Sequence, residues 1–247
     1  MTTVGIIPCR YASSRFPGKP LAEIAGKPMM WHVYQRTASC KLIDAVYIAT
    51  DDARIESACR DFGLEVLMTR NDHFTGTDRV AECARAVQAE HYINVQGDEP
   101  MIAPAAIEAV ARTINESENP RVVASNAFAM FENAADVIDT NNVKVVLAYD
   151  DTAMAFSRQP IPYPKQGDVR YRRQLGLYGF RRSGLQMFSE LKPGPVEQAE
   201  GVEMLRFIEH GHAVQMVEVE DRSIPVDTEA DLIRVRRLME ADAAKDG

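Results

Sequence analysis

The chain has 247 residues, of which 46% are hydrophobic and 26% are charged, and its formal net charge is −8. This composition excludes disordered and fibrous architectures. The acidic balance disfavours a general nucleic-acid binder, so an anionic substrate would need a local cluster of Arg and Lys. No stretch approaches the ~20 consecutive apolar residues that span a bilayer, so we expect no membrane insertion.

The cysteines and the first residues of the sequence indicate a reducing compartment. Cys9, Cys40, Cys59 and Cys83 form no CxxC pair, which disfavours a zinc knuckle or a redox dithiol. A chain of this length does not need disulfides for stability, so free thiols are expected. The segment 1–9 lacks the basic and long apolar regions of a secretory signal. We therefore expect a cytoplasmic protein.

The first half of the sequence alternates short apolar runs with amphipathic segments. The pattern predicts strands at 4–8, 45–50, 64–68 and 92–95, and helices at 29–38, 54–62, 77–88 and 105–114. Asp51-Asp52 and Pro104 stand where two of these helices would begin. Alternation of buried strands with helices predicts an α/β fold, with a mainly parallel sheet and helices on both faces.

The second half is less regular. It predicts strands at 122–127, 143–148, 175–180 and 214–219, an extended piece at 155–157, and helices at 197–209 and 228–239. Three prolines alternate at 160, 162 and 164, which favours an extended surface segment and excludes a helix. We interpret residues from about 128 to 210 as an insertion that returns the chain to the main sheet, within a single domain of residues 1–247.

A basic loop follows the first predicted strand, from Pro8 to Pro20. It carries Arg10, Arg15 and Lys19 together with two serines and a glycine. Ligands of α/β sheets bind at the carboxyl ends of the strands, where this loop would lie. Guanidinium forks, an ammonium and backbone N–H groups are the donors that a triphosphate requires. The loop matches neither a Walker A motif nor a dinucleotide fingerprint, and a solvated basic loop is the alternative.

Two acidic residues also follow predicted strands. Asp98 comes after the strand 92–95 and a glycine, where it would ligate a Mg²⁺ that bridges phosphate oxygens. The alternative is an Asp that caps the next helix. Asp227 follows the strand 214–219 and would supply a second carboxylate to the same metal. Its alternative is also a cap, because Asp227 or Thr228 suits the start of the final helix.

A further loop runs into the helix predicted at 77–88. Thr69-Arg70 precedes it, and Thr75 to Arg79 form its entry. Backbone N–H groups of such a loop would hold a ribose or a base edge, and Arg70 would add a phosphate contact. A helix capped by Thr75 or Thr77 is the alternative, and it is compatible with binding.

These segments together resemble the 3-deoxy-manno-octulosonate cytidylyltransferases, the CMP-Kdo synthetases. The matching pattern is PxRYxSxRxPGKPL, ATDD, [ST]GT[DE]R, VQGDEP and a late VDT, with VKVV at 143–146 and FSR at 156–158. It extends from Gly5 to about Arg237. The resemblance implies a Rossmann-like nucleotidyltransferase fold and a homodimer built through the insertion. It also implies Mg²⁺-dependent transfer of CMP from CTP to a sugar acid, with release of diphosphate, for lipopolysaccharide or capsule biosynthesis.

The resemblance also assigns roles by position. Catalytic roles fall to Arg10, Lys19 and Asp98. Nucleotide contacts fall to Pro8, Arg10, Arg15, Lys19, Arg70, Thr75, Gly76, Thr77 and Gln96. Contacts to the acceptor fall to Gln96, Arg158, Gln174, Tyr178, Glu203 and Met204, and the metal ligands would be Asp98 and Asp227.

The sequence departs from the family pattern in the acceptor half. Gln174 replaces a usual His, Met204 a usual Gln and Ala155 a common Tyr. A buried polar group that loses its partner costs ~1–3 kcal/mol, so such changes alter which sugar hydroxyls are satisfied. Kdo and related 2-keto-3-deoxy acids are all possible acceptors. The alternative is a nucleotidyltransferase of the same fold that acts on a different acid. A catalytically silent nucleotide-binding paralogue is disfavoured because Asp98 and Asp227 are both present.

Overall fold

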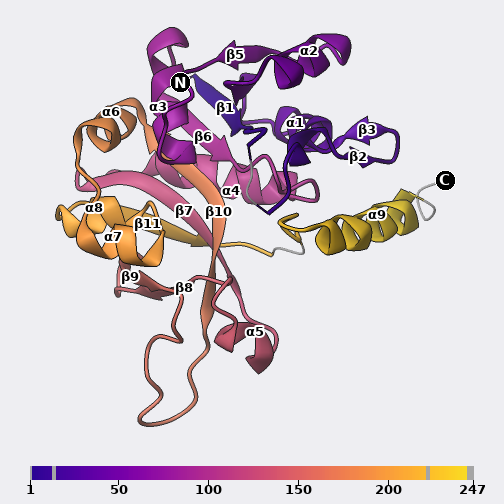
Figure 1. The fold of residues 1–247 in the computed structure, drawn as a ribbon. Coiled ribbons are helices and arrows are strands. Elements are labelled where there is room, and N and C mark those ends of the chain that lie inside the picture. Colours follow the sequence, from indigo (N-terminus) through magenta and orange to yellow (C-terminus); the bar gives the residue numbers. More distant parts are fainter. Residues whose placement is uncertain (1, 13–14, 221–222, 244–247) are drawn as a thin grey trace.

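The computed structural model describes residues 2–12, 15–220 and 223–243, so the two serines at 13 and 14 lie outside it. Within these ranges a nine-stranded sheet has the path β11-β7-β10-β6-β1-β4-β5, and β8 and β9 extend it beside β10 (Figure 1). Its strands are β1 (Thr3–Pro8), β4 (Ala45–Thr50), β5 (Val66–Met68), β6 (His91–Val95), β7 (Val122–Met130), β8 (Lys144–Leu147), β9 (Ala153–Ser157), β10 (Arg172–Arg181) and β11 (Ala213–Glu218). A small hairpin joins β2 (Glu23–Ile24) to β3 (Lys27–Pro28).

The main sheet is mostly parallel, as predicted. β1 pairs in parallel with β4 and β6, β4 with β5, and β11 with β7. β10 is the exception, because it runs antiparallel between β6 and β7. The carboxyl ends of β1, β4 and β6 therefore lie along one edge of the sheet, where the sequence motifs follow them.

Helices cover both faces of the sheet, which confirms the expected architecture. Their bounds are α1 (Met29–Ala38), α2 (Ala53–Asp61), α3 (Gly76–Ala86), α4 (Pro104–Glu116), α5 (Ala134–Ile138), α6 (Arg182–Glu190), α7 (Pro195–Glu200), α8 (Leu205–Glu209) and α9 (Glu229–Ala243), with a 3₁₀ turn at Lys19–Leu21. Met30, Ile55 and Ile107 bring α1, α2 and α4 into one core cluster. Val80 and Leu185 bring α3 and α6 into the other. Among the described helices, none is long and apolar enough to cross a membrane.

Two helices begin at the caps that the sequence indicates. The Asp52 carboxylate accepts the N–H of Arg54 at 2.9 Å and caps α2. Thr75 caps α3 in a capping box, since its hydroxyl accepts the Asp78 N–H at 3.1 Å and Asp78 accepts the Thr75 N–H at 3.0 Å. These caps fix the entry of both helices next to the carboxyl edge of the sheet.

The second half differs from the sequence prediction in its helices. The helix predicted at 197–209 is two helices, because Gly201 ends α7 in a left-handed conformation with φ of 62°. The sequence prediction includes neither α5 nor α6. The amphipathic pattern of α6 is weak, because Leu185 and Phe188 are its main buried apolar side chains and most of its other positions are polar.

Residues from about 128 to 210 contribute to the main sheet and also form a projecting part of the molecule, called the arm below. β10 lies within this range and is an interior strand of the main sheet, between β7 and β6. The arm consists of α5, β8, β9 and the connection 158–171, which projects from the body of the molecule (Figure 1). Helix α9 leaves in another direction, and its Leu232 and Val235 pack with Ile24 near the β2–β3 hairpin.

Helix α6 gives a test of how tightly the core cluster of α3 and α6 is packed. A Cβ at Gly184 would lie 2.2 Å from the carbonyl oxygen of Val123 on β7. Gly184→Ala should therefore lower the free energy of unfolding by ~1–3 kcal/mol through overpacking, although Ala is the better helix former by ~1 kcal/mol. Urea denaturation measures the change, with the exposed neighbour Ser183→Ala as the control. A Gly184→Ala variant as stable as the wild type would contradict this packing.

Candidate active site

Two adjoining cavities form a cleft at the carboxyl edge of the sheet. The loop lobe, of about 440 Å³, is bounded by Pro8, Cys9, Arg10, Ala12, Arg15, Lys19, Pro20, Arg79 and Gly97. The arm lobe, of about 500 Å³, is lined by residues that include Thr75, Asn141, Asn142, Val143, Arg158, Arg173, Gln174, Gly176, Tyr178, Glu197 and Glu203. Both lobes share Gly76, Gln96, Asp98 and Asp227. The sequence motifs thus meet in one cleft, and the two predicted metal ligands lie where its lobes join.

The basic loop folds back so that its lysine reaches the centre of the cleft. Gly18 has a φ of 72°, which favours glycine, and its N–H donates to the carbonyl of Tyr11 at 2.8 Å. The 3₁₀ turn that follows places Lys19 with its Nζ 2.6 Å from Asp98 Oδ2 and 3.2 Å from Asp227 Oδ1. The loop is therefore a built wall of the cleft rather than a freely solvated segment.

The charge of Lys19 is stabilised by these contacts. Burial lowers the pKa of Lys19, but the hydrogen-bonded carboxylates of Asp98 and Asp227 outweigh that effect and raise it above its ordinary value. Arg15 adds a second cation, with Nη2 2.9 Å from Asp227 Oδ1. The ammonium stays charged at neutral pH, in a place where it can meet an anionic ligand.

Neither Asp98 nor Asp227 caps a helix. The next helix after Asp98 is α4, which begins at Pro104 with Ala103 as its cap residue. At α9 the Thr228 hydroxyl accepts the Asp231 N–H at 3.3 Å, and Asp231 accepts the Thr228 N–H at 2.8 Å. Thr228 is the cap, which leaves the carboxylate of Asp227 for the cleft. The Val226 N–H donates to the Asp98 carbonyl at 2.9 Å and joins the two loops.

The chemistry of this pair suits a magnesium ion. Asp98 and Asp227 converge on one cation, the Lys19 ammonium, so their oxygens lie close enough to share a positive charge. Mg²⁺ is commonly held by one or two carboxylates together with substrate phosphates and water. Among the described residues there is no cluster of three or more His, Cys, Asp or Glu that would form a complete protein cage. The donors therefore fit an ion that arrives with a phosphate ligand.

An irregularity in β10 shapes the arm lobe. The pairing of β10 with β7 shifts register between Gln174 and Tyr178, which is typical of a β-bulge beside a site. A Cβ at Gly176 would lie only 2.7 Å from Cγ of Gln96, so glycine makes room for that side chain. Gln174 Nε2 donates to Asn126 Oδ1 at 2.9 Å. The amides of Gln96 and Gln174 are thus both held at the wall of the lobe.

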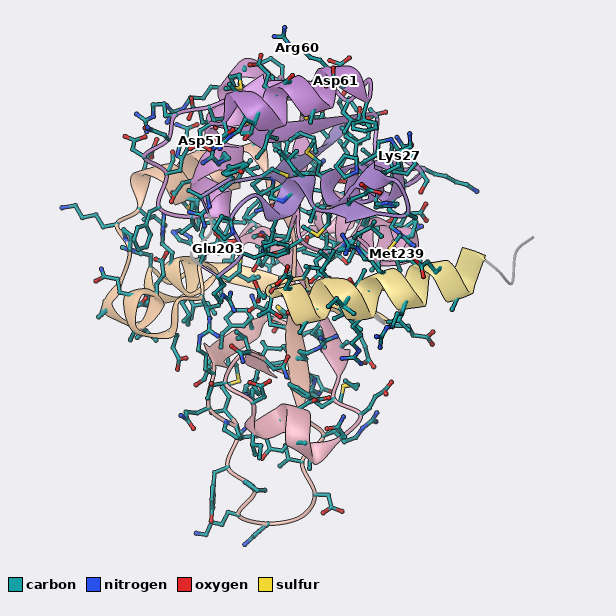
Figure 2. The ribbon with its side chains drawn as sticks, turned by 45° about the vertical axis from the view of Figure 1, so that its right-hand side comes forward. Lys27, Asp51, Arg60, Asp61, Glu203 and Met239 are labelled. Atoms are coloured by element: carbon teal, nitrogen blue, oxygen red, sulfur yellow. The ribbon has the colours of Figure 1, made fainter. Side chains whose placement is uncertain are left out.

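Charged groups on the other wall are also fixed. Glu203, near the middle of the molecule in Figure 2, accepts the Thr77 N–H at 3.2 Å. Burial raises the pKa of Glu203, while hydrogen bonds from Thr77 and Thr75 act in the opposite direction. Arg158 Nε donates to the carbonyl of Glu200 at 2.7 Å. The arm lobe therefore offers a preformed guanidinium and a carboxylate whose proton affinity is increased.

Three residues assigned from the resemblance do not line either lobe in the described structure. Met204 is fully buried in a core cluster, so its position does not favour the expected contact with an acceptor. Thr77 is also fully buried, and its hydroxyl accepts the Asn94 side-chain amide at 3.1 Å. Arg70 lies in a separate cavity along α3, with Nε 3.2 Å from Asp72 Oδ1. The remaining assigned residues line the cleft.

Sequence reasoning did not single out several residues of the cleft. Arg79 is 1% exposed, contacts Thr69 and lies 3.1 Å from Asp51 Oδ1. It ends the [ST]GT[DE]R motif, which was a usable signal. Arg173 and Asn142 also line the arm lobe. Asn142 lies in a polar turn with no distinctive pattern, so only the fold places it there.

Comparisons with known proteins agree with this geometry. A family model described as Cytidylyltransferase matches residues 4–219. The 3-deoxy-manno-octulosonate cytidylyltransferase of Solibacter usitatus is 44% identical over 240 residues, 96% of this chain and 94% of that protein. The chain belongs to the 3-deoxy-manno-octulosonate cytidylyltransferase family. The Escherichia coli member is 43% identical over 242 residues, 97% of each chain.

Solved structures show the same relationship. A CMP:2-keto-3-deoxy-manno-octonic acid synthetase in complex with CTP matches with a TM-score of 0.92 and 42% identity, over 98% of this chain and 100% of that chain. A cytidylyltransferase from Leptospira borgpetersenii matches with a TM-score of 0.65 and 16% identity, over 96% of this chain and 85% of that chain. The second likeness shows the fold alone. Together they confirm the Rossmann-like nucleotidyltransferase fold.

The pKa of Glu203 gives a pH prediction for stability. Because the folded protein binds this proton more tightly than the unfolded chain, the contribution of Glu203 to stability should fall as the pH rises above the ordinary Glu pKa of 4.5. Glu203→Gln has no such proton, so its stability relative to the wild type should increase over that range. Urea denaturation of both proteins between about pH 4.5 and 7 tests this, with the exposed Glu132→Gln as the control. Parallel pH curves for Glu203→Gln and wild type would show that Glu203 has an ordinary pKa.

Proposed function

We propose that this chain catalyses the Mg²⁺-dependent transfer of CMP from CTP to 3-deoxy-manno-octulosonate, with release of diphosphate. Membership of the family and the likeness to a CTP complex support the nucleotide and the acceptor. The single observation that carries the proposal is the junction of the cleft. There Lys19, Asp98 and Asp227 converge between a cationic lobe and a polar lobe.

The cationic lobe suits the triphosphate. In the reaction the anomeric hydroxyl of the sugar attacks the α-phosphorus, and negative charge builds on the leaving diphosphate. Arg10, Arg15 and Lys19 place fixed positive charge in this lobe. Preorganised cations stabilise charge where it develops and require no covalent enzyme intermediate. Asp98 and Asp227 would hold the Mg²⁺, which when bound neutralises phosphate charge as a Lewis acid.

The polar lobe suits a hydroxylated acid. Arg158 and Arg173 supply positive charge for a carboxylate, and Gln96, Gln174 and Glu203 supply hydrogen-bonding groups for hydroxyls. Gln174 stands where the family usually has a His, and its amide is already engaged by Asn126. This difference favours a second candidate, the same transfer to another 2-keto-3-deoxy sugar acid.

We also propose a homodimer and a cytoplasmic location. Tyr149, Met154, Ile138 and Tyr163 on the arm are large apolar side chains with more than half of their surface exposed. Large exposed apolar side chains on one projecting arm favour a protein interface there, and we propose that a second copy of the chain covers them. All four cysteines are free and buried, as expected in a reducing compartment. The CMP-sugar product would supply lipopolysaccharide or capsule biosynthesis.

Diphosphate release tests the proposed function. The purified protein is mixed with Mg²⁺, each of the four ribonucleoside triphosphates, and Kdo or related 2-keto-3-deoxy acids in turn. We expect release that requires both CTP and the acid, with the highest kcat/KM for Kdo or for one close relative. Release with another nucleotide only, or no release with any pair, would contradict the proposal. Release with CTP and another class of acid would assign a different acceptor.

The proposed metal ligands give a prediction about individual residues. Asp98→Asn and Asp227→Asn should each lower turnover at least about a hundredfold, because losing one charged ligand removes ~3 kcal/mol of transition-state stabilisation. Asp61→Asn, on the exposed end of α2 in Figure 2, is the matched control and should keep wild-type turnover. Steady-state rates at saturating Mg²⁺ and circular dichroism separate catalysis from folding. Near-wild-type turnover in either site variant would remove that residue from the metal site.

A further inference from the structure

Lys144 is a buried cation beside the arm lobe that plays no part in the site described so far. It is fully buried at the start of β8, within the VKVV segment. Its Nζ donates to three backbone carbonyls, those of Asp139 at 2.9 Å, Asn142 at 2.8 Å and Arg158 at 2.7 Å. An ammonium has three N–H groups, so this set uses its full capacity.

These carbonyls belong to two walls of the lobe. Asp139 and Asn142 delimit the turn 139–142, which follows α5 and contributes Asn141 and Asn142 to the lining. Arg158 follows β9 and lines the same lobe. The Lys144 ammonium therefore joins two separate segments of the wall, although Lys144 does not itself line the cavity.

The orientation of the Arg158 guanidinium depends on the same turn. Its Nη1 donates to the carbonyl of Thr140 at 2.9 Å, and its Nε donates to the carbonyl of Glu200 at 2.7 Å. Its backbone N–H donates to the Glu200 carboxylate at 2.8 Å. An arginine has five N–H donors, so two such bonds fix the plane of the guanidinium and leave further N–H groups for a ligand.

A buried ammonium bound only to carbonyls carries a large desolvation cost. Burial accordingly lowers the pKa of Lys144, with the Asp139 carboxylate acting in the opposite direction. Apolar residues of similar volume often stabilise a fold as well as buried charges do. The role of Lys144 that the contacts indicate is therefore geometric, because one atom fixes the turn 139–142 against the end of β9.

We propose that Lys144 is a positioning residue for acceptor recognition, which holds the turn 139–142 and the end of β9 so that Arg158 presents its guanidinium to the carboxylate of the sugar acid. The inference rests on the proposed function and deepens it, because it assigns the carboxylate of the acceptor to a preorganised arginine. Lys144 acts through Arg158 and touches neither substrate.

Substrate-resolved kinetics of Lys144→Met test this role. Met is close in length and lacks the ammonium, so the turn loses its link to β9. We expect KM for Kdo to rise at least about tenfold, with KM for CTP within about twofold of the wild type. Ile114→Val, on the buried face of α4, is the control for lost stability and should change neither KM. Equal changes in both KM values, or none, would overturn the proposal.

A double-mutant cycle with Arg158→Ala identifies the route of the effect. If Lys144 acts through Arg158, Lys144→Met should change KM for Kdo by less than about twofold in the Arg158→Ala background. Effects that multiply independently would overturn the proposal. If Lys144→Met does not fold, Lys144→Arg replaces it, since it keeps the charge but misplaces the donors. That variant should raise KM for Kdo at least about threefold, and no rise would overturn the proposal.

The wild-type assay separates this inference from the proposed function. Wild-type activity with CTP and Kdo, combined with multiplicative effects in the cycle, would refute only the role of Lys144. Wild-type activity with another sugar acid alone would refute Kdo as the acceptor, and the same cycle would then be measured with that acid.

Discussion

The contact of one ammonium with two carboxylates is the constraint on which the cleft depends. Lys19 lies between Asp98 and Asp227, which come from loops far apart in the sequence. Two partly buried carboxylates that face each other without a cation would repel. The lysine removes that repulsion in the absence of ligand, and the hydrogen bond from Val226 to Asp98 ties the two loops together. In the proposed reaction, a metal–nucleotide complex would enter the cleft at this junction.

The sheet explains why the cleft has two lobes of different chemistry. β1 and β6 are parallel neighbours, so the basic loop and Asp98 leave the same edge. β10 enters the sheet antiparallel beside β6 and brings Gln174 and Tyr178 to that edge from the opposite direction. One lobe is therefore built from short loops after parallel strands, and the other from a bulged strand and the arm. Under the proposed function, substitutions in the arm lobe would change the acceptor without disturbing the cationic lobe.

The sequence predicts the loop lobe better than the arm lobe, for a physical reason. Arg10 and Asp98 come shortly after strands whose apolar runs are plain in the sequence, so their place at the carboxyl edge follows from the sheet alone. Lys19 reaches the same edge through the turn at Gly18. The arm lobe depends on long-range packing. Met204 occupies a position that the family pattern assigns to the pocket, but its side chain packs into the core.

Some features of the structure cannot be located from hydrophobic periodicity or residue type. The three carbonyl partners of Lys144 are set by tertiary structure and not by residue type. Gly201 divides one apparent helical pattern into α7 and α8; this glycine is a helix-stop signal that hydrophobic periodicity alone does not register. The sequence is also compatible with caps at Asp98 and Asp227, whereas in the structure Ala103 and Thr228 stand at the two helix starts.

The response of stability to Mg²⁺ in Lys19→Met tests the central claim most directly. In this variant the carboxylates of Asp98 and Asp227 lose the shared ammonium, so a divalent cation should replace it. We predict a lower melting temperature than the wild type without metal, and a Mg²⁺-dependent rise that exceeds the wild-type rise by about 2–4 °C, equivalent to ~1 kcal/mol. Adding Asp227→Asn should abolish that extra rise. An equal response to Mg²⁺ in wild type and Lys19→Met would show that the two carboxylates do not form a shared cation site.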